Sequence, residues 1–160
     1  MSDRTVVTLK ETVHVEYCTA RGVVSRGDLF LRPLDANTRG ERLMDVLSER
    51  AFIPLRAAEG LVFLATRHLA WVRLDLFAAL DELDPEAEDD ADSVVARVVV
   101  ELVQGAALEG TLRFALPAMT RRLGDYLERV SPFFPLRTDD WIYLVSAAQV
   151  ASITPLSEGR

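Results

Sequence analysis

The chain has 160 residues, of which 49% are hydrophobic and 8% aromatic, which is enough apolar surface for a packed core. Its only cysteine is Cys18, so the count excludes an intrachain disulfide and a cysteine-rich zinc site. The net charge is −7, but eight of the twelve residues from Asp81 to Asp92 are acidic, and the remainder holds 17 acidic and 18 basic residues. This near neutrality argues against nucleic acid as the partner.

Membrane insertion is not expected either. The sequence has no run of 18 apolar residues, and Met1 to Lys10 lacks a basic segment followed by an apolar run. We therefore expect a cytoplasmic protein. Seventeen of the 18 basic residues are arginine, a bias typical of GC-rich bacterial coding sequences.

The chain matches itself when it is shifted by 80 to 81 residues. The shared patterns are Arg-Leu-x-Asp-x-Leu and Phe-x-Pro-Leu-Arg, and the matches keep their order along the chain. The matched segments are 42–47 with 122–127, 52–56 with 133–137, 61–64 with 142–145 and, with small changes in turn length, 13–16 with 98–101. This series predicts an internal duplication. We expect a first repeat at 1–75, an acidic, solvated linker at 76–94 and a second repeat at 95–160.

The first two segments of each repeat are predicted strands. Apolar residues alternate with period two in the first segment, as they do in a half-buried strand. The second segment contains a shared glycine, Gly27 or Gly110, and glycine inside a strand pattern commonly marks a bulge or a sharp bend. The four predicted strands are 12–18, 23–32, 96–103 and 108–116.

A short helix is predicted next. Thr38 and Glu41 have the spacing of a capping box, and Thr120 is the matching cap in the second repeat. Both copies have apolar residues at i, i+3 and i+4, a pattern that predicts one face docked on the sheet. These residues are Leu43, Val46 and Leu47, and Leu123, Tyr126 and Leu127.

Three strands are predicted to complete each repeat. The first contains Pro54 or Pro135, which cannot donate to a sheet ladder and therefore predicts an edge strand or a strand start. The other two are predicted at 61–66 and 69–74, and at 141–146 and 150–154. The fold class expected is mainly β (α+β), with two tandem small bent-sheet or barrel repeats, each running strand, strand, helix, three strands.

This element order resembles the small SH3-like and Sm-like barrels in architecture, although in the Sm order the helix precedes all the strands. The string Gly-x-Leu, Arg-Leu-x-Asp-x-Leu, Phe-x-Pro-Leu within 110–136 also resembles small bacterial β-barrel-like domains of uncharacterised function, usually met as single copies. The resemblance implies a fold but no chemistry. An RNA-binding Sm-like barrel stays an alternative, although Trp71 and Trp141 are not at equivalent positions and neither lies in a basic cluster.

Residues typical of catalysis are not clustered in the sequence. The only histidines, His14 and His68, have no metal-ligand spacing, and no nucleophile elbow, phosphate loop or dinucleotide fingerprint occurs. We therefore expect no enzyme, no cofactor and no metal site. Cys18 is expected to be a buried, inert thiol.

Charged residues that recur in both repeats are the candidates for partner binding. An arginine and an aspartate lie three residues apart on each predicted helix, where they form either a binding pair or a solvated ion pair. One arginine follows Pro-Leu in each repeat and suits either an anion or a structural ion pair. The candidates are Arg42, Asp45, Arg56, Arg122, Asp125 and Arg137.

The predicted strands at 61–65 and 141–145 are apolar at every position, so both of their faces need cover. The expected cover is the equivalent strand of the other repeat, which packs the repeats about a pseudo-twofold axis. Val62, Leu64, Tyr143 and Val145 are the predicted interface residues, and a one-residue register error would exchange them for their neighbours.

The function expected from these observations is that of a non-catalytic adaptor or scaffold. Its partner is another protein, bound at a sheet edge or in a groove between the repeats, and self-association is a further option. A small-ligand sensor that binds between the repeats is an alternative, as is the RNA-binding barrel. A large apolar pocket with convergent arginines would favour the sensor, and a basic stripe with exposed aromatics would favour RNA.

Overall fold

The structure, a computed structural model, describes residues 11–31, 42–76, 93–114, 122–130 and 132–156. These residues form ten antiparallel strands in one sheet, with two short α-helices and two 3-10 turns, which confirms the mainly-β class. Within the same ranges, no helix combines the length and the apolar character needed to cross a membrane. Most of the predicted acidic linker, together with Thr38, Glu41 and Thr120, lies outside the described residues.

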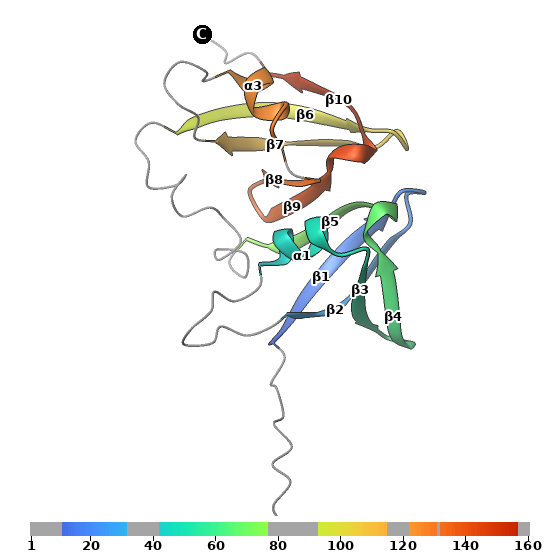
Figure 1. Cartoon of the computed structure of the whole chain (residues 1–160). Coiled ribbons are helices and arrows are strands. Elements are labelled where there is room, and N and C mark those ends of the chain that lie inside the picture. Colours follow the sequence, from blue (N-terminus) through green and yellow to red (C-terminus); the bar gives the residue numbers. More distant parts are fainter. Residues whose placement is uncertain (1–10, 32–41, 77–92, 115–121, 131, 157–160) are drawn as a thin grey trace, which may run out of the picture.

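The sheet consists of two five-stranded blocks (Figure 1). Block 1 contains β1 (Glu11–Thr19), β2 (Val24–Leu31), α1 (Leu43–Glu49), β3 (Phe52–Ala57), β4 (Gly60–Ala65), η1 (Thr66–His68) and β5 (Leu69–Asp75). Block 2 contains β6 (Val94–Leu102), β7 (Ala107–Phe114), α3 (Leu123–Leu127), β8 (Phe133–Arg137), β9 (Trp141–Ser146), η3 (Ala147–Gln149) and β10 (Val150–Pro155). The strand order is β10-β6-β7-β8-β9 in block 2, followed by β5-β1-β2-β3-β4 in block 1.

The two blocks share their strand order and their registers. Val15 lies opposite Gly27 in block 1, and Val98 lies opposite Gly110 in block 2. The predicted match of 13–16 with 98–101 is therefore wrong by two residues, because Val15 rather than Val13 is the counterpart of Val98. A two-residue shift preserves the alternation of faces, so the hydrophobic pattern alone could not detect it. The common origin of the blocks stays a prediction.

Helix α1 buries the face that its spacing predicts. Leu43, Val46 and Leu47 are all buried in the core of block 1. The helix begins at Leu43 with Arg42 at the N-cap and no side-chain cap, four residues after the predicted cap at Thr38. In α3 the counterpart side chains are only half-buried, so the apolar face of this helix is less completely buried than that of α1.

The prolines mark neither edge strands nor strand starts, so that prediction is wrong, and both lie inside their strands. β3 lies between β2 and β4, and β8 lies between β7 and β9. The Thr66 amide donates to the Ala51 carbonyl, so by alternation the nitrogen of Pro54 faces away from β4. On that side β3 pairs with β2 only at Leu55 and Arg56, so Pro54 removes no ladder bond.

The blocks are joined by pairing of β5 with β9, in the register Trp71–Val145 to Asp75–Trp141 (Figure 1). The predicted pseudo-twofold contact between equivalent strands is therefore wrong, because β4, the counterpart of β9, lies at the far end of the sheet. Each block contributes a different edge, so the contact is heterologous. A β5 edge satisfies the backbone groups of β9 as well as a β4 edge would, and hydrophobicity alone cannot distinguish the two partners.

The face of β9 that meets block 1 is also the alternate of the predicted one. Ile142 and Leu144 are buried in the core of block 1, whereas Tyr143 and Val145 belong to the core of block 2. A one-residue error in register exchanges the two faces of a strand, and a period-two pattern alone cannot exclude such an error. On β4, Leu64 packs against the core of its own block and Val62 is exposed, so neither joins the two blocks.

Tyr126 of α3 should make the stability of the protein fall at alkaline pH. Burial raises its pKa to about 12, and its ring stacks on Phe114 with the centroids 4.7 Å apart. Because the unfolded phenol has a pKa of about 10, the stability contribution is complete below pH 10 and is lost as pH rises towards 12. We expect a loss of roughly 2 kcal/mol over this window. Urea unfolding at several pH values should show it, and Tyr126→Phe should flatten this part of the profile. An unchanged slope in the variant would contradict the assignment.

Candidate protein-binding surface

The charge pairs predicted on the helices do not form. Arg42 and Arg122 occupy the N-cap positions of α1 and α3, and their carbonyls accept the amides of Val46 and Tyr126. Asp45 and Asp125 lie in the first turns. Within the described part of the chain, no ion pair joins Arg42 to Asp45 or Arg122 to Asp125. The four residues lie in two separate blocks and are not brought together.

The two arginines that follow Pro-Leu have different surroundings. Arg56 is exposed on β3, and its guanidinium lies 5.2 Å from the centroid of the Phe30 ring. Arg137 is half-buried on β8, opposite Thr111 and Ile142. Arg56 alone belongs to the surface described next.

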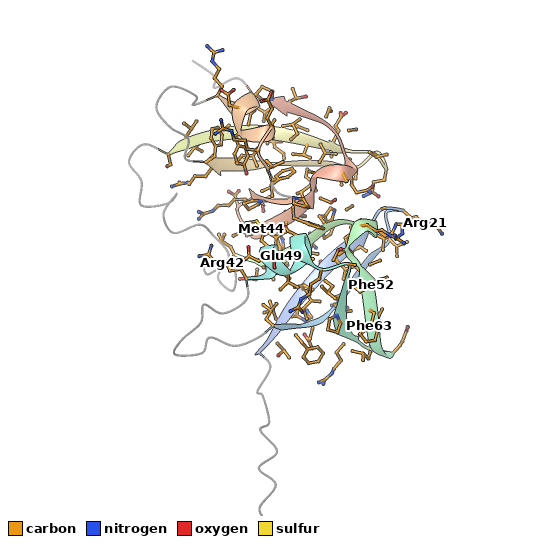
Figure 2. All side chains as sticks on the ribbon, viewed as in Figure 1. Arg21, Arg42, Met44, Glu49, Phe52 and Phe63 are labelled. Atoms are coloured by element: carbon orange, nitrogen blue, oxygen red, sulfur yellow. The ribbon has the colours of Figure 1, made fainter. Side chains whose placement is uncertain are left out.

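A solvent-exposed apolar surface covers β3 and β4 on the side opposite the core of block 1. We call it the outer face, and its residues are Phe52, Pro54, Arg56, Leu61 and Phe63. Phe52 is 56% exposed, Leu61 60% and Phe63 63%. Figure 2 shows Phe52 and Phe63 on the part of block 1 that lies away from block 2. Large side chains left this exposed on a continuous patch are typical of an interaction site.

The outer face is hollowed into a groove. The groove has a volume of about 610 Å³, and Phe30 of β2 forms part of its wall together with Pro54, Arg56, Leu61 and Phe63. Its walls are thus mainly apolar, with one cation stacked on an aromatic ring. A groove of this composition suits apolar side chains, with an optional carboxylate near Arg56.

An edge strand lies beside this groove. Of the described strands, β4 and β10 end the sheet, so each has one side without a neighbouring strand. The amide of Thr66, directly after β4, donates to the carbonyl of Ala51, directly before β3. By alternation, the backbone amides of Leu61 and Phe63 point outwards. A partner strand could therefore add to β4 while its side chains enter the groove.

The junction of the blocks contains a second group of polar and aromatic residues. Nε of Arg73 on β5 donates to Oε2 of Glu16 at 2.8 Å, and its Nη2 contacts the same oxygen. Nη1 donates to the hydroxyl of Tyr143 on β9 at 2.9 Å, and the guanidinium lies 4.3 Å from the Trp141 ring centroid. Arg73 thus connects three neighbouring strands.

The hydrogen bonds of Arg73 determine the direction in which its pKa shifts. Partial burial lowers its pKa, but the hydrogen bonds to Tyr143 and Glu16 outweigh that effect and raise the pKa above the usual value. A cavity of about 460 Å³ opens beside it, lined by Thr12, Val13, His14, Glu16, Arg73, Asp75 and Trp141. Its described lining includes a single arginine, which is already bound to two protein groups, so these residues do not provide the convergent arginines expected of an anion sensor.

Sequence reasoning missed the outer face. The self-match aligns Leu61 with Ile142 and Phe63 with Leu144, and all four residues are large and apolar. Ile142 and Leu144 are 0% exposed, whereas their counterparts face solvent. The difference arises from which edge of the sheet continues into the other block, and the sequence carries no local signal for that. Comparisons with family models, curated proteins and solved structures found no match to this chain.

Proposed function

We propose that this protein is a non-catalytic protein-binding adaptor or scaffold, which takes up an extended partner strand at β4. The observation that carries the proposal is the coincidence of an edge strand with three exposed apolar side chains, Phe52, Leu61 and Phe63. Outward amides supply backbone hydrogen bonds, and the groove supplies selectivity for alternate side chains of the partner.

Protein binding is better supported than the two alternatives. A sensor at the junction would have to compete with Glu16 and Tyr143 for Arg73. Among the residues that the structure describes, the outer face carries one arginine, Arg56, rather than a basic stripe, which does not favour binding to a phosphate backbone.

Selection from a library of displayed peptides tests the proposal. The full chain is immobilised sparsely, so that neighbouring molecules do not meet, and bound peptides are sequenced. We expect enriched peptides with apolar residues at alternate positions, which lose binding to Phe63→Lys because the charge blocks the groove and the strand edge. Val23→Lys is the matched control, since Val23 is a similarly exposed apolar residue in the β1–β2 turn. Peptides that bind Phe63→Lys as well as the wild type would refute binding at β4.

A further inference from the structure

The joint between the blocks has a donating and a receiving side. Phe133, Ile142 and Leu144 of block 2 donate their side chains to the core of block 1, where they are at most 3% exposed. The receiving side consists of α1 and β5, which contribute Leu43, Val46, Leu47, Leu69, Val72 and Leu74 to the same core. Helix α1 also lies against β8.

Block 1 has the donating side as well, but nothing among the described residues receives it. Phe52, Leu61 and Phe63 hold the strand positions that Phe133, Ile142 and Leu144 hold in block 2, because β3 and β4 pair in the register of β8 and β9. All three are more than half exposed. The outer face is thus the counterpart of a surface that the same chain buries elsewhere.

Block 2 in turn has the receiving side, and no described segment inserts side chains into it. Its counterparts of the α1 and β5 residues lie on α3 and β10, and we call them the α3–β10 face: Leu123, Tyr126, Leu127, Val150 and Ile153. They pack against the block 2 core but stay only partly buried. In block 1 the corresponding core is closed by the three donated side chains. The two ends of the sheet therefore complement each other.

The backbones of the two end strands are complementary too. The Leu156 amide donates to the Arg97 carbonyl of β6, so by alternation the Ile153 amide points away from β6. The Phe63 amide points away from β3 for the same reason. Transfer of the β5–β9 register to these strands places Phe63 opposite Ile153 and Val62 opposite Thr154. Phe63 and Ile153 then form a hydrogen-bonded pair.

We infer that the strand which adds to β4 is β10 of a second copy of this chain, so that copies join head to tail in the manner of the internal joint. The inference rests on the proposed function and specifies its partner. Each contact uses two different surfaces, so every added copy presents a new β4 edge or a new β10 edge. Repeated joints give a closed ring if the rotation closes, and an open chain otherwise.

The joint between copies is weaker than the one within the chain. Pro155 has no amide to replace the donor that Leu74 supplies on β5, so the Pro155–Leu61 pair keeps only the bond from the Leu61 amide to the Pro155 carbonyl. Thr154 takes the place of Arg73 and Val62 takes the place of Tyr143, so the hydrogen bond between those two side chains is lost. Ser152 takes the place of Trp71. Only the apolar side of the joint is reproduced, so association is reversible and depends on concentration.

Two variants that block opposite ends provide the test. Phe63→Lys blocks the outer face and leaves β10 intact, whereas Ile153→Lys blocks β10 and leaves β4 intact. By sedimentation velocity up to about 1 mM, we expect wild-type assembly, two monomeric variants, and a dimer that grows no further when the variants are mixed. Assembly that persists in Ile153→Lys alone would show a β4–β4 contact and overturn the head-to-tail inference.

Disulfide trapping tests the same joint without altering Ile153. Chains carrying Val62→Cys and chains carrying Thr154→Cys are mixed under mild oxidation, and Val62→Cys with Ser152→Cys is the control, two residues out of register. We expect a crosslinked dimer at least tenfold more abundant than in the control, because opposed non-hydrogen-bonded pairs suit a disulfide. A wild type that stays monomeric and gives no selective crosslink, yet binds the selected peptides, would overturn the inference and leave strand addition at β4 standing.

Discussion

Replacing Gly27 or Gly110 with alanine should lower the free energy of unfolding by about 2–3 kcal/mol, which urea titration at neutral pH can measure. A Cβ on Gly27 would lie 2.7 Å from the backbone oxygen of Arg56 and 2.6 Å from Leu55 Cδ2. On Gly110 it would lie 2.6 Å from the Arg137 oxygen. Both glycines lie where the next strand crosses closely, and a backbone oxygen cannot move aside as a side-chain tip can.

Gly124→Ala is the matched control for these variants. Gly124 lies in α3 with nothing within 4 Å of an added Cβ, and alanine favours a helix over glycine by about 1 kcal/mol. The same chemical change should therefore stabilise the protein at one position and destabilise it at the other two. Equal effects at all three glycines would show that close strand crossing is not what selects glycine at positions 27 and 110.

Leu144→Ala should destabilise the chain by about 3 kcal/mol, whereas Phe63→Ala should change its stability by less than about 0.5 kcal/mol. The two residues hold equivalent positions on β9 and β4, but Leu144 is fully buried in the block 1 core and Phe63 faces solvent. Truncation leaves a cavity only at Leu144.

The stability of both variants is measured by urea unfolding. The protein concentration is kept low, so that assembly does not contribute. The two blocks share core residues, and we expect one cooperative transition in which Leu144→Ala shifts the midpoint. A separate early transition of block 2 alone, or equal losses in the two variants, would contradict the view that Leu144 completes the core of block 1.

The sequence predicts the strands closely. The predicted strand 141–146 has the bounds of β9, and 69–74 differs from β5 by one residue, because turns and alternation are local properties. The two glycines were predicted to mark a bulge or a sharp bend, but the strand registers run without a shift at Gly27 and Gly110, and what distinguishes both positions is the close approach of the next strand. The element order within each block follows from the same local signals.

The contact between the blocks could not be predicted in the same way. Pairing β9 with β5 or with β4 satisfies the same backbone groups, and the difference rests on how whole edges fit together. Ile142 and Tyr143 are both apolar enough to be buried, so alternation could not reveal which of them enters the other core. The candidate site depends on this contact, and for that reason Phe52, Leu61 and Phe63 were not predicted.

The pairing of β5 with β9 also sets an order of events during synthesis. Arg73 and its partner Tyr143 are 70 residues apart in the chain, so β5 leaves the ribosome well before β9 exists. Until then, Val72 and Leu74 lack the side chains of Ile142 and Leu144 that cover them in the finished sheet. A nascent chain that has not reached Ser146 thus presents an unpaired apolar edge, which is the kind of surface that chaperones bind.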